Sequence, residues 1–409
     1  MFRLLEHHSG GLNFRLDPYD AGGNRFTTLI GANGTGKSRL LGELAEARKA
    51  ENPLMERDAG EPTTLAVSNL VLDAFPKPRL LSWNYRYLGL RQANNTVSTG
   101  SLEASFGPHL LELRSGWLSN TDLSRILQQV GVEGYSLAAS PAKRARSLEG
   151  GDRLGPFLES VGLRWPEQPE RALRGELEDV VQDLLTEENL GDARDVGRRL
   201  RNLAEYFDVP PYLIIAALRR VFGLELSVRF AGANGESVPT LSAGQAMLLS
   251  MLLRILAAIR PSSLVLIDEP ETGAHPEWQS RFISLLRSTV PEEAESHFFI
   301  ATHSPYLVAD STDVLVARAQ GEFEEVAAEL KGMSIEHVLY RVFGARVVGN
   351  YEVESDLSTL ITWIATSDRG RPPADVTSAA RRLQGITDDS TPTVKNLLDE
   401  FERAAGGRS

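Results

Sequence analysis

The chain has 409 residues, of which 42% are hydrophobic and 24% charged, with a formal net charge of −12 and no cysteine. This is an ordinary globular composition, long enough for more than one domain, and the lack of cysteine excludes disulfides and thiolate metal sites. No apolar run reaches the roughly 18 residues that span a bilayer, residues 1–14 lack the apolar stretch of a signal peptide, and the net acidity argues against a surface that is basic all over. We therefore expect a cytoplasmic protein without membrane contact.

A strand, a loop and a helix follow one another near the start of the chain. Arg25–Ile30 is a short β-type run, and Lys37–Ala47 has leucines at helical spacing. The loop between them fits the pattern Gly-x-x-x-x-Gly-Lys-Ser over residues 31–38. Such a loop wraps phosphates with its backbone N–H groups, while its lysine reaches the β- and γ-phosphates and its serine binds Mg²⁺. A glycine-rich turn before a helix, without ligand, is the alternative.

ATP and Mg²⁺ are therefore the expected cofactors. The residues that we assign to nucleotide binding in this loop are Gly31, Asn33, Gly34, Thr35, Gly36, Lys37 and Ser38. Ser38 is also an expected Mg²⁺ ligand.

The middle of the chain changes character twice. Strands are predicted at Thr64–Leu72 and Arg79–Ser82. After a polar stretch the signals turn helical, with apolar residues three and four apart in the ranges 123–130, 171–185, 195–206 and 212–221. Strand signals return at 224–230, 263–267 and 297–302, and the last two are apolar runs typical of a parallel sheet that is buried on both faces.

The expected fold class is α/β, a P-loop nucleoside triphosphatase with a mixed sheet core flanked by helices. We divide the chain into the N-terminal half of an ATPase core (1–98), a helical insertion (99–222), the C-terminal half of the core (223–320) and a C-terminal helical region (321–409).

Two carboxylates end the apolar run at 263–267. Asp268 at such a position can enter the Mg²⁺ shell, and Glu269 can act on the water that attacks the γ-phosphate. A solvated acidic turn is the alternative.

A second candidate anion site is the turn Leu241–Gln245, which stands before a helix predicted at 245–259. A simple helix cap by Ser242 would explain the same residues. Downstream, His303 follows the strand predicted at 297–302, where an isolated histidine is more often structural than catalytic.

In series, these motifs resemble those of the ABC ATPase superfamily, whose signature Leu-Ser-Gly-Gly-Gln has Ala243 in place of its first glycine here. The resemblance implies that Ser242, Gly244 and Gln245 bind an ATP held by the Lys37 of an opposite subunit. The protein would then work as a homodimer or a higher assembly of dimers, and His303 would be the switch histidine that touches the γ-phosphate and the attacking water.

The resemblance also marks two further positions. Glu271–Pro276 is similar to the D-loop that crosses the dimer interface, where His275 is either an interface residue or part of a turn. The family places a sensor glutamine after an early strand, and Asn84, Gln92 or neither fills that role here.

Asn33 points away from the transporter branch, which carries serine there. The phrases at 266–276 and 301–307 resemble those of overcoming-lysogenization-defect (OLD)-like ATPases, in particular the Septu and retron-associated anti-phage ATPases. The resemblance covers residues 24–47 and 240–310 well and the rest loosely. OLD proteins carry their own nuclease, but the roughly 100 residues after His303 lack its strand-end acidic pattern. The expected effector is therefore a separate protein such as a nuclease.

Two other functions stay open: a DNA-clamping recombination-repair ATPase similar to RecF, and an ATP-binding scaffold with negligible turnover. Direct DNA binding would use basic residues of the insertion, and the candidates are Lys143, Arg144, Arg146, Arg198, Arg199 and Arg201. Solvated helix faces paired with nearby acids are the alternative for these residues, and the favoured one.

Overall fold

A computed structural model gives the fold. It describes residues 3–18, 22–47, 63–70, 72–76, 84–90, 99–141, 154–160, 175, 179–184, 190–232, 237–238, 241–308, 310–318, 321–326, 351–366, 372–387 and 392–405. Within these residues no helix is both long and apolar enough to cross a membrane.

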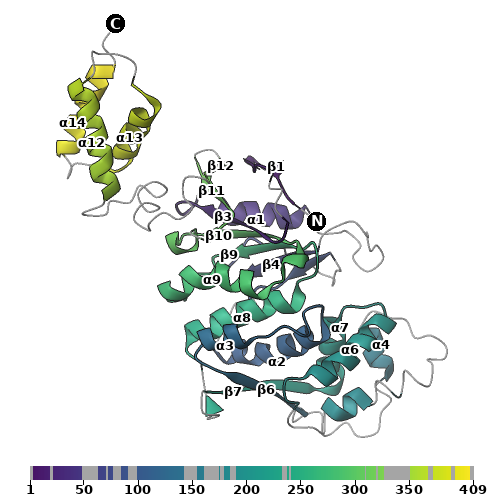
Figure 1. Ribbon diagram of the computed structural model, residues 1–409. Helices are drawn as coiled ribbons and strands as arrows, with labels where there is room; N and C mark the ends of the chain where they lie inside the picture. Colours follow the sequence, from purple (N-terminus) through teal and green to yellow (C-terminus); the bar gives the residue numbers. More distant parts are fainter. Residues whose placement is uncertain are drawn as a thin grey trace.

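Nine strands of the described residues form the central sheet (Figure 1), in the order β1-β2-β12-β11-β3-β10-β9-β4-β5. Its strands are β1 (Glu6–Ser9), β2 (Leu12–Arg15), β3 (Arg25–Ile30), β4 (Thr64–Ser68), β5 (Tyr85–Tyr87), β9 (Leu264–Asp268), β10 (His297–Thr302), β11 (Asp313–Ala317) and β12 (Glu322–Glu325). The run from β11 to β5 is parallel, whereas β1 and β2, and β11 and β12, pair antiparallel. The expected α/β class with a mixed sheet flanked by helices is therefore confirmed. Because β3, β10 and β9 are parallel neighbours, whatever follows them gathers at one edge of the sheet.

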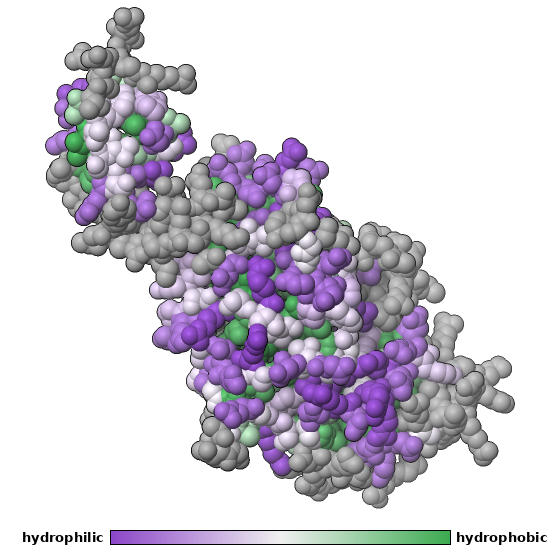
Figure 2. Space-filling model, viewed as in Figure 1, coloured by the Kyte–Doolittle hydropathy of each residue, from purple (hydrophilic) through white to green (hydrophobic). Residues whose placement is uncertain are grey.

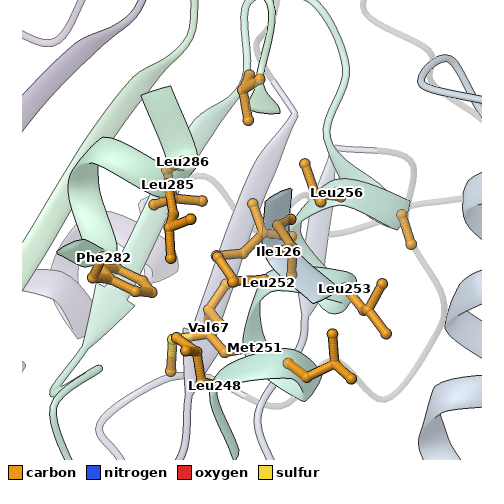
Figure 3. Close-up of a cluster of buried hydrophobic side chains, with 14 of the residues drawn as sticks. Val67, Ile126, Leu248, Met251, Leu252, Leu253, Leu256, Phe282, Leu285 and Leu286 are labelled. Atoms are coloured by element: carbon orange, nitrogen blue, oxygen red, sulfur yellow. The ribbon is translucent and has the colours of Figure 1, made fainter. Parts of the chain in front are cut away.

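Helices cover both faces of this sheet. One face packs on α1 (Lys37–Glu46), and the other on α8 (Ala243–Ala258) and α9 (Pro276–Thr289). Figure 3 shows the face covered by α8 and α9, where leucines of α8 belong to the same apolar cluster as Phe282, Leu285 and Leu286 of α9. In β3 and β10, neighbouring phenylalanines stack beneath these helices, with the rings of Phe26 and Phe298 4.5 Å apart. Burial on both faces is the reason why β9 and β10 are near-continuous apolar runs.

A second lobe packs against α8. It contains α2 (Thr99–Ser115), α3 (Ser124–Gln129), β6 (Gly134–Pro141), α4 (Leu154–Ser160), α6 (Arg194–Tyr206), α7 (Pro211–Phe222), β7 (Leu224–Ala231) and β8 (Ser237–Val238). β6, β7 and β8 form a separate three-stranded antiparallel sheet. The insertion predicted at 99–222 is thus wrong as a purely helical segment. The small residues of β6 hide the alternation of apolar and polar side chains that marks a strand. Its partner β7 begins after residue 222, where the predicted insertion ends.

The C-terminal helices form a core of their own. They are α12 (Tyr351–Thr366), α13 (Ala374–Gly385) and α14 (Pro392–Ala405), which pack on one another around Leu360, Leu383 and Phe401. The guanidinium of Arg382 holds the carboxylate of Asp356 through bonds of 2.7 and 2.8 Å. Helices are therefore confirmed here, but the region predicted to be helical from 321 onward begins with β12, which belongs to the central sheet. Three of the four residues of β12 are glutamates, so it lacks an apolar signal.

Three other predicted elements differ from the structure or lie partly or wholly outside it. The strand predicted over Thr64–Leu72 ends at Ser68. The one at Arg79–Ser82 lies outside the described residues, as does part of the helix at 171–185, although 179–184 are helical.

The exposed surface of the described residues is mostly polar. Figure 2 shows hydrophilic side chains spread over the visible face, with apolar ones scattered among them. The large hydrophobic side chains that stand out are Leu72, Trp117, Tyr206 and Ile361. They lie far apart in the sequence, and single exposed apolar residues of this kind are normal for a globular protein.

Candidate functional site

The phosphate loop connects β3 to α1 at the shared edge of the sheet. Gly34 and Gly36 have φ of 78° and 96°, in the left-handed region that favours glycine. Gly31 is held by packing instead, because a Cβ there would lie 2.8 Å from the Cβ of Ala317 in β11. These backbone angles and this close packing let the chain turn sharply into the start of α1, as a phosphate-binding loop requires.

Lys37 is buried in this loop and already has partners. Its Nζ donates to the carbonyls of Gly31 and Ala32, at 2.8 and 3.0 Å, and lies 3.3 Å from Nδ1 of His303. Burial lowers the pKa of Lys37 to about 8, although the nearby carboxylates of Glu269, Glu271 and Asp268 oppose the shift. The cation is thus held in place by the protein itself, beside the groups that end β9 and β10.

Asp268 is the last residue of β9 and faces Ser38. The Ser38 hydroxyl donates to Oδ1 of Asp268 at 2.9 Å, while the buried Oδ2 has no hydrogen-bond partner among the described residues. Burial raises the pKa of Asp268 to about 7, partly opposed by the bond from Ser38. A hydroxyl and a carboxylate with a spare oxygen are hard ligands of the kind that Mg²⁺ prefers. These two residues therefore fit the predicted Mg²⁺ site.

Glu269, the residue after Asp268, has a backbone conformation that is unusual for a residue other than glycine. Its φ is 48°, a left-handed value that costs a non-glycine residue of order 1 kcal/mol or more and often marks a functional position. Its Oε1 lies 3.0 Å from Nε2 of His303, and both side chains are partly exposed. Lys37, His303 and Glu269 thus form one chain of contacts across β3, β10 and β9. The sequence predicted all three, and the structure brings them together.

Glu271 is a member of this site that sequence reasoning assigned only to a loop. Its Oε1 accepts from the Thr302 hydroxyl and from the N–H groups of His303 and Ser304, at 2.6, 2.6 and 3.2 Å. Burial raises the pKa of Glu271. The signal that could have identified it is a third carboxylate two residues after the acidic pair.

The turn before α8 is a helix cap in this structure. The N–H of Gln245 donates to the Ser242 hydroxyl at 3.3 Å, and the N–H of Ser242 donates back to Oε1 of Gln245 at 2.8 Å, which makes a capping box. The Gln245 side chain also donates to the carbonyl of Val130 at 3.1 Å. Gly244 packs on the D-loop segment, since a Cβ there would lie 2.8 Å from the carbonyl oxygen of Gly273. These bonds and contacts do not join the turn to the phosphate loop of its own chain.

Two other predicted positions are now placed. Asn84 is wrong as a sensor beside the nucleotide. It lies directly before β5, and its carbonyl accepts from the N–H of Thr64 at the amino end of β4, the edge opposite the phosphate loop. Gln92 lies outside the described residues. The Nδ1 of His275 accepts from the N–H of Glu277 at 3.3 Å and so caps α9.

The basic residues of α6 have local partners. Arg198 pairs with Asp195 at 2.7 Å, Arg199 pairs with Asp183, and the guanidinium of Arg201 donates to the carbonyl of Ser115 at 3.2 Å. This agrees with the solvated-face alternative. Residues 143–146 lie outside the described part of the chain.

One protein-family model matches the chain, over residues 157–309, with the description "AAA domain, putative AbiEii toxin, Type IV TA system". The matched stretch carries the α8 turn, Asp268, Glu269 and His303, but it is less than half of the chain. It marks this part as similar to an ATPase domain. No curated protein matches the chain.

Among solved structures, a nucleotide-free ATP-binding cassette from an ABC transporter is similar at 13% identity and a TM-score of 0.28, over 78% of this chain and 88% of that one. The SmcHead bound to the C-winged helix domain of ScpA has 15% identity and a TM-score of 0.31, over 77% of this chain and 91% of that one. UvrA2 from Deinococcus radiodurans has 15% identity and a TM-score of 0.28, over 77% of this chain and 36% of that one. Scores this low carry no conclusion about what the chain does.

Proposed function

We propose that this protein is an ABC-type ATP hydrolase whose two sites form between two copies of the chain. The observation that carries the proposal is the chain of contacts from Lys37 through His303 to Glu269, beside the Ser38 and Asp268 pair. A cation for phosphates, a carboxylate for a water molecule and a pair of hard oxygen ligands are the parts that phosphoryl transfer to water needs.

Each of these residues has a distinct part in the reaction. Lys37 exchanges its carbonyl partners for phosphate oxygens of ATP. Ser38 and Asp268 would hold Mg²⁺, which supplies charge neutralisation for the phosphates when bound. Glu269 accepts a hydrogen bond from the attacking water and draws charge from it, and His303 donates toward the γ-phosphate.

The second copy of the chain contributes the turn before α8 to each ATP site. Ser242 is exposed at the start of that helix, and its own chain uses the hydroxyl only as a cap. A helix N-terminus that presents a hydroxyl and a glycine suits an anion, and the resemblance to the ABC signature assigns that anion to the nucleotide of the opposite subunit. The cap leaves this possible, because a hydroxyl can accept one hydrogen bond and donate another.

We propose further that the ATPase gates a separate effector, such as a nuclease, in anti-phage defence. The OLD-like motifs favour this reading, as does the toxin–antitoxin description of the matching family model. The RecF-like alternative, a DNA clamp, loses support because the described arginines of α6 have local partners. The scaffold alternative, ATP binding without turnover, leaves the contact between Glu269 and His303 without a purpose.

The decisive test is assembly. Specific activity of the wild-type protein should rise with protein concentration, and the Glu269→Gln protein should form dimers in ATP when its mass is measured in solution. Mixing the inactive Lys37→Ala and Ser242→Arg proteins should restore some activity, because one site of each mixed dimer then carries neither change. If the Glu269→Gln protein binds ATP and stays monomeric where the wild type is fully active, the composite site is wrong.

The effector and the alternatives have tests of their own. Co-purification of a nuclease that is released or activated when ATP is hydrolysed would support gating. Salt-dependent DNA binding by the isolated protein would favour the clamp instead.

A further inference from the structure

Glu271 is not among the residues that we assign to nucleotide binding, yet its carboxylate accepts three hydrogen bonds at the site. Its Oε1 accepts from three consecutive residues, through the hydroxyl of Thr302 and the N–H groups of His303 and Ser304. Consecutive N–H groups that converge on one oxygen form an anion-binding nest, and a charged acceptor strengthens each bond. The carboxylate thereby fixes the backbone of the turn that carries the His303 side chain.

The same turn is also bound to α9 and, through α9, to the loop that precedes it. The Ser304 hydroxyl donates to Oε1 of Gln279 at 2.6 Å, and the Gln279 amide donates to the carbonyl of Ala274 at 2.9 Å. The backbone and the Ser304 side chain of the turn that follows β10 are therefore bound to residues 271–279, and the turn meets the phosphate loop through the His303 side chain. Its position depends on a segment that contacts no phosphate in the proposed mechanism.

The imidazole ring of His303 extends from this turn and lies between the side chains of Glu269 and Lys37. Nε2 lies 3.0 Å from Glu269 and Nδ1 lies 3.3 Å from Lys37. Both contacts need the ring in one orientation, and the ring follows the backbone of residue 303. A displacement of about 1 Å in an active site can cost about 100-fold in rate.

We propose that Glu271 is a positioning residue for ATP hydrolysis: its carboxylate holds the turn that presents His303 to Glu269 and Lys37. This inference rests on the proposed ATPase function. It predicts that loss of Glu271 impairs turnover and leaves ATP binding intact, since Glu271 bonds to none of the phosphate-loop residues.

The burial of Glu271 supports a specific need for the carboxylate. Its second oxygen, Oε2, is buried without a hydrogen-bond partner among the described residues. A carboxylate at that place is costly for folding alone, so a purely structural turn would be served better by a neutral side chain. In the Glu271→Gln protein the amide oxygen could still accept at the turn, but as a weaker, uncharged acceptor.

The test compares Glu271→Ala and Glu271→Gln with the wild type. We expect kcat to fall about 10- to 100-fold in Glu271→Ala and to an intermediate value in Glu271→Gln. ATP affinity, measured by titration, should change by less than about threefold, because the lysine and the loop amides that bind phosphate are untouched. The matched control is Glu293→Ala, which removes an exposed carboxylate from a 3₁₀ turn at the other edge of the sheet and should leave both values unchanged.

Amide hydrogen exchange gives a readout that is independent of catalysis. The bonds to Glu271 should protect the N–H groups of His303 and Ser304 in the wild type. Glu271→Ala should exchange them about tenfold faster or more, which is the effect of one lost bond, and Glu271→Gln should exchange them at an intermediate rate because its bond is weaker. The proposal is overturned if Glu271→Ala folds and keeps kcat within twofold. It is also overturned if ATP affinity falls together with kcat, which indicates general damage to the site.

If Glu271→Ala does not fold, Glu271→Gln decides: wild-type kcat together with wild-type exchange at 303 and 304 overturns the proposal. A wild-type protein without ATPase activity is a failure of the proposed function and is seen before any variant is made. The exchange experiment then still tests whether Glu271 holds the turn.

Discussion

Replacing Lys37 by alanine tests the phosphate loop most directly. In the structure the Nζ of Lys37 has three contacts, with the carbonyls of Gly31 and Ala32 and with Nδ1 of His303. ATP replaces them with charge-assisted bonds to two phosphate groups, worth about 3–6 kcal/mol together. The three contacts that are lost on binding offset about 1.5–4.5 kcal/mol of this. The difference between the midpoints, about 1.5 kcal/mol, predicts a Kd for ATP about tenfold weaker in Lys37→Ala.

The same change should do little to the folded state. Alanine loses the bonds to Gly31 and Ala32, but it also removes an amine whose charge is disfavoured by burial, as its lowered pKa shows. We expect the free energy of unfolding to stay within about 1 kcal/mol of the wild-type value.

The assay is an ATP titration followed calorimetrically, with thermal unfolding of the same samples. Lys395→Ala, which removes one exposed lysine from α14, is the control for net charge. An affinity within threefold of the wild type in a folded Lys37→Ala protein would refute the assignment of Lys37 to phosphate. Weak binding accompanied by early melting would show instead that the loop needs Lys37 in order to fold.

Three further predictions concern catalysis, pH and the C-terminal helices. Glu269→Gln should bind ATP normally and lose about 10²- to 10⁴-fold in kcat, so near-normal turnover would remove Glu269 from the mechanism. Asp268 must lose its proton to bind Mg²⁺ and Lys37 must keep its own, so kcat/KM should rise as the pH passes about 7 and fall as it passes about 8. In EDTA, where no Mg²⁺ is bound, ATP affinity should show only the fall. An ATP affinity in EDTA that is constant from pH 6 to 9 would contradict this. Arg382→Ala leaves the carboxylate of Asp356 mostly buried without its guanidinium, at a cost of about 3–5 kcal/mol. Limited proteolysis should then cut the C-terminal helices while ATP binding persists, and an unchanged digest would show that the pair contributes little.

The parts of the site that the sequence predicted are those with a local physical signature. A loop that wraps phosphate needs glycines and a lysine at fixed spacing. The apolar run before Asp268 is short and rich in β-branched and leucine residues, which favours a strand that is buried on both faces. Since β3, β9 and β10 are parallel, finding their ends in the sequence was enough to bring Lys37, Glu269 and His303 together.

The parts that it missed depend on pairing between distant segments. β6 is recognisable only from its partner β7, and the glutamate-rich β12 only from β11 and β2. Asn84 was misplaced because it stands at the start of β5, whose place in the sheet comes from pairing with β4. The role of Glu271 follows from bonds to a turn more than 30 residues away, which no periodicity encodes.

The contact between Gly244 and Gly273 gives neighbouring positions of the α8 turn different tolerance to substitution. Ala243 is exposed, so its methyl group meets solvent and departs from the usual glycine without a steric penalty. One residue later, any side chain would press on the Gly273 carbonyl at 2.8 Å and on the Trp278 ring at 3.1 Å. A saturation library across this turn should therefore return many residues at 243 and almost none but glycine at 244. A sequence search that demands both glycines would pass over chains like this one, whereas a search that requires only the second would retain them.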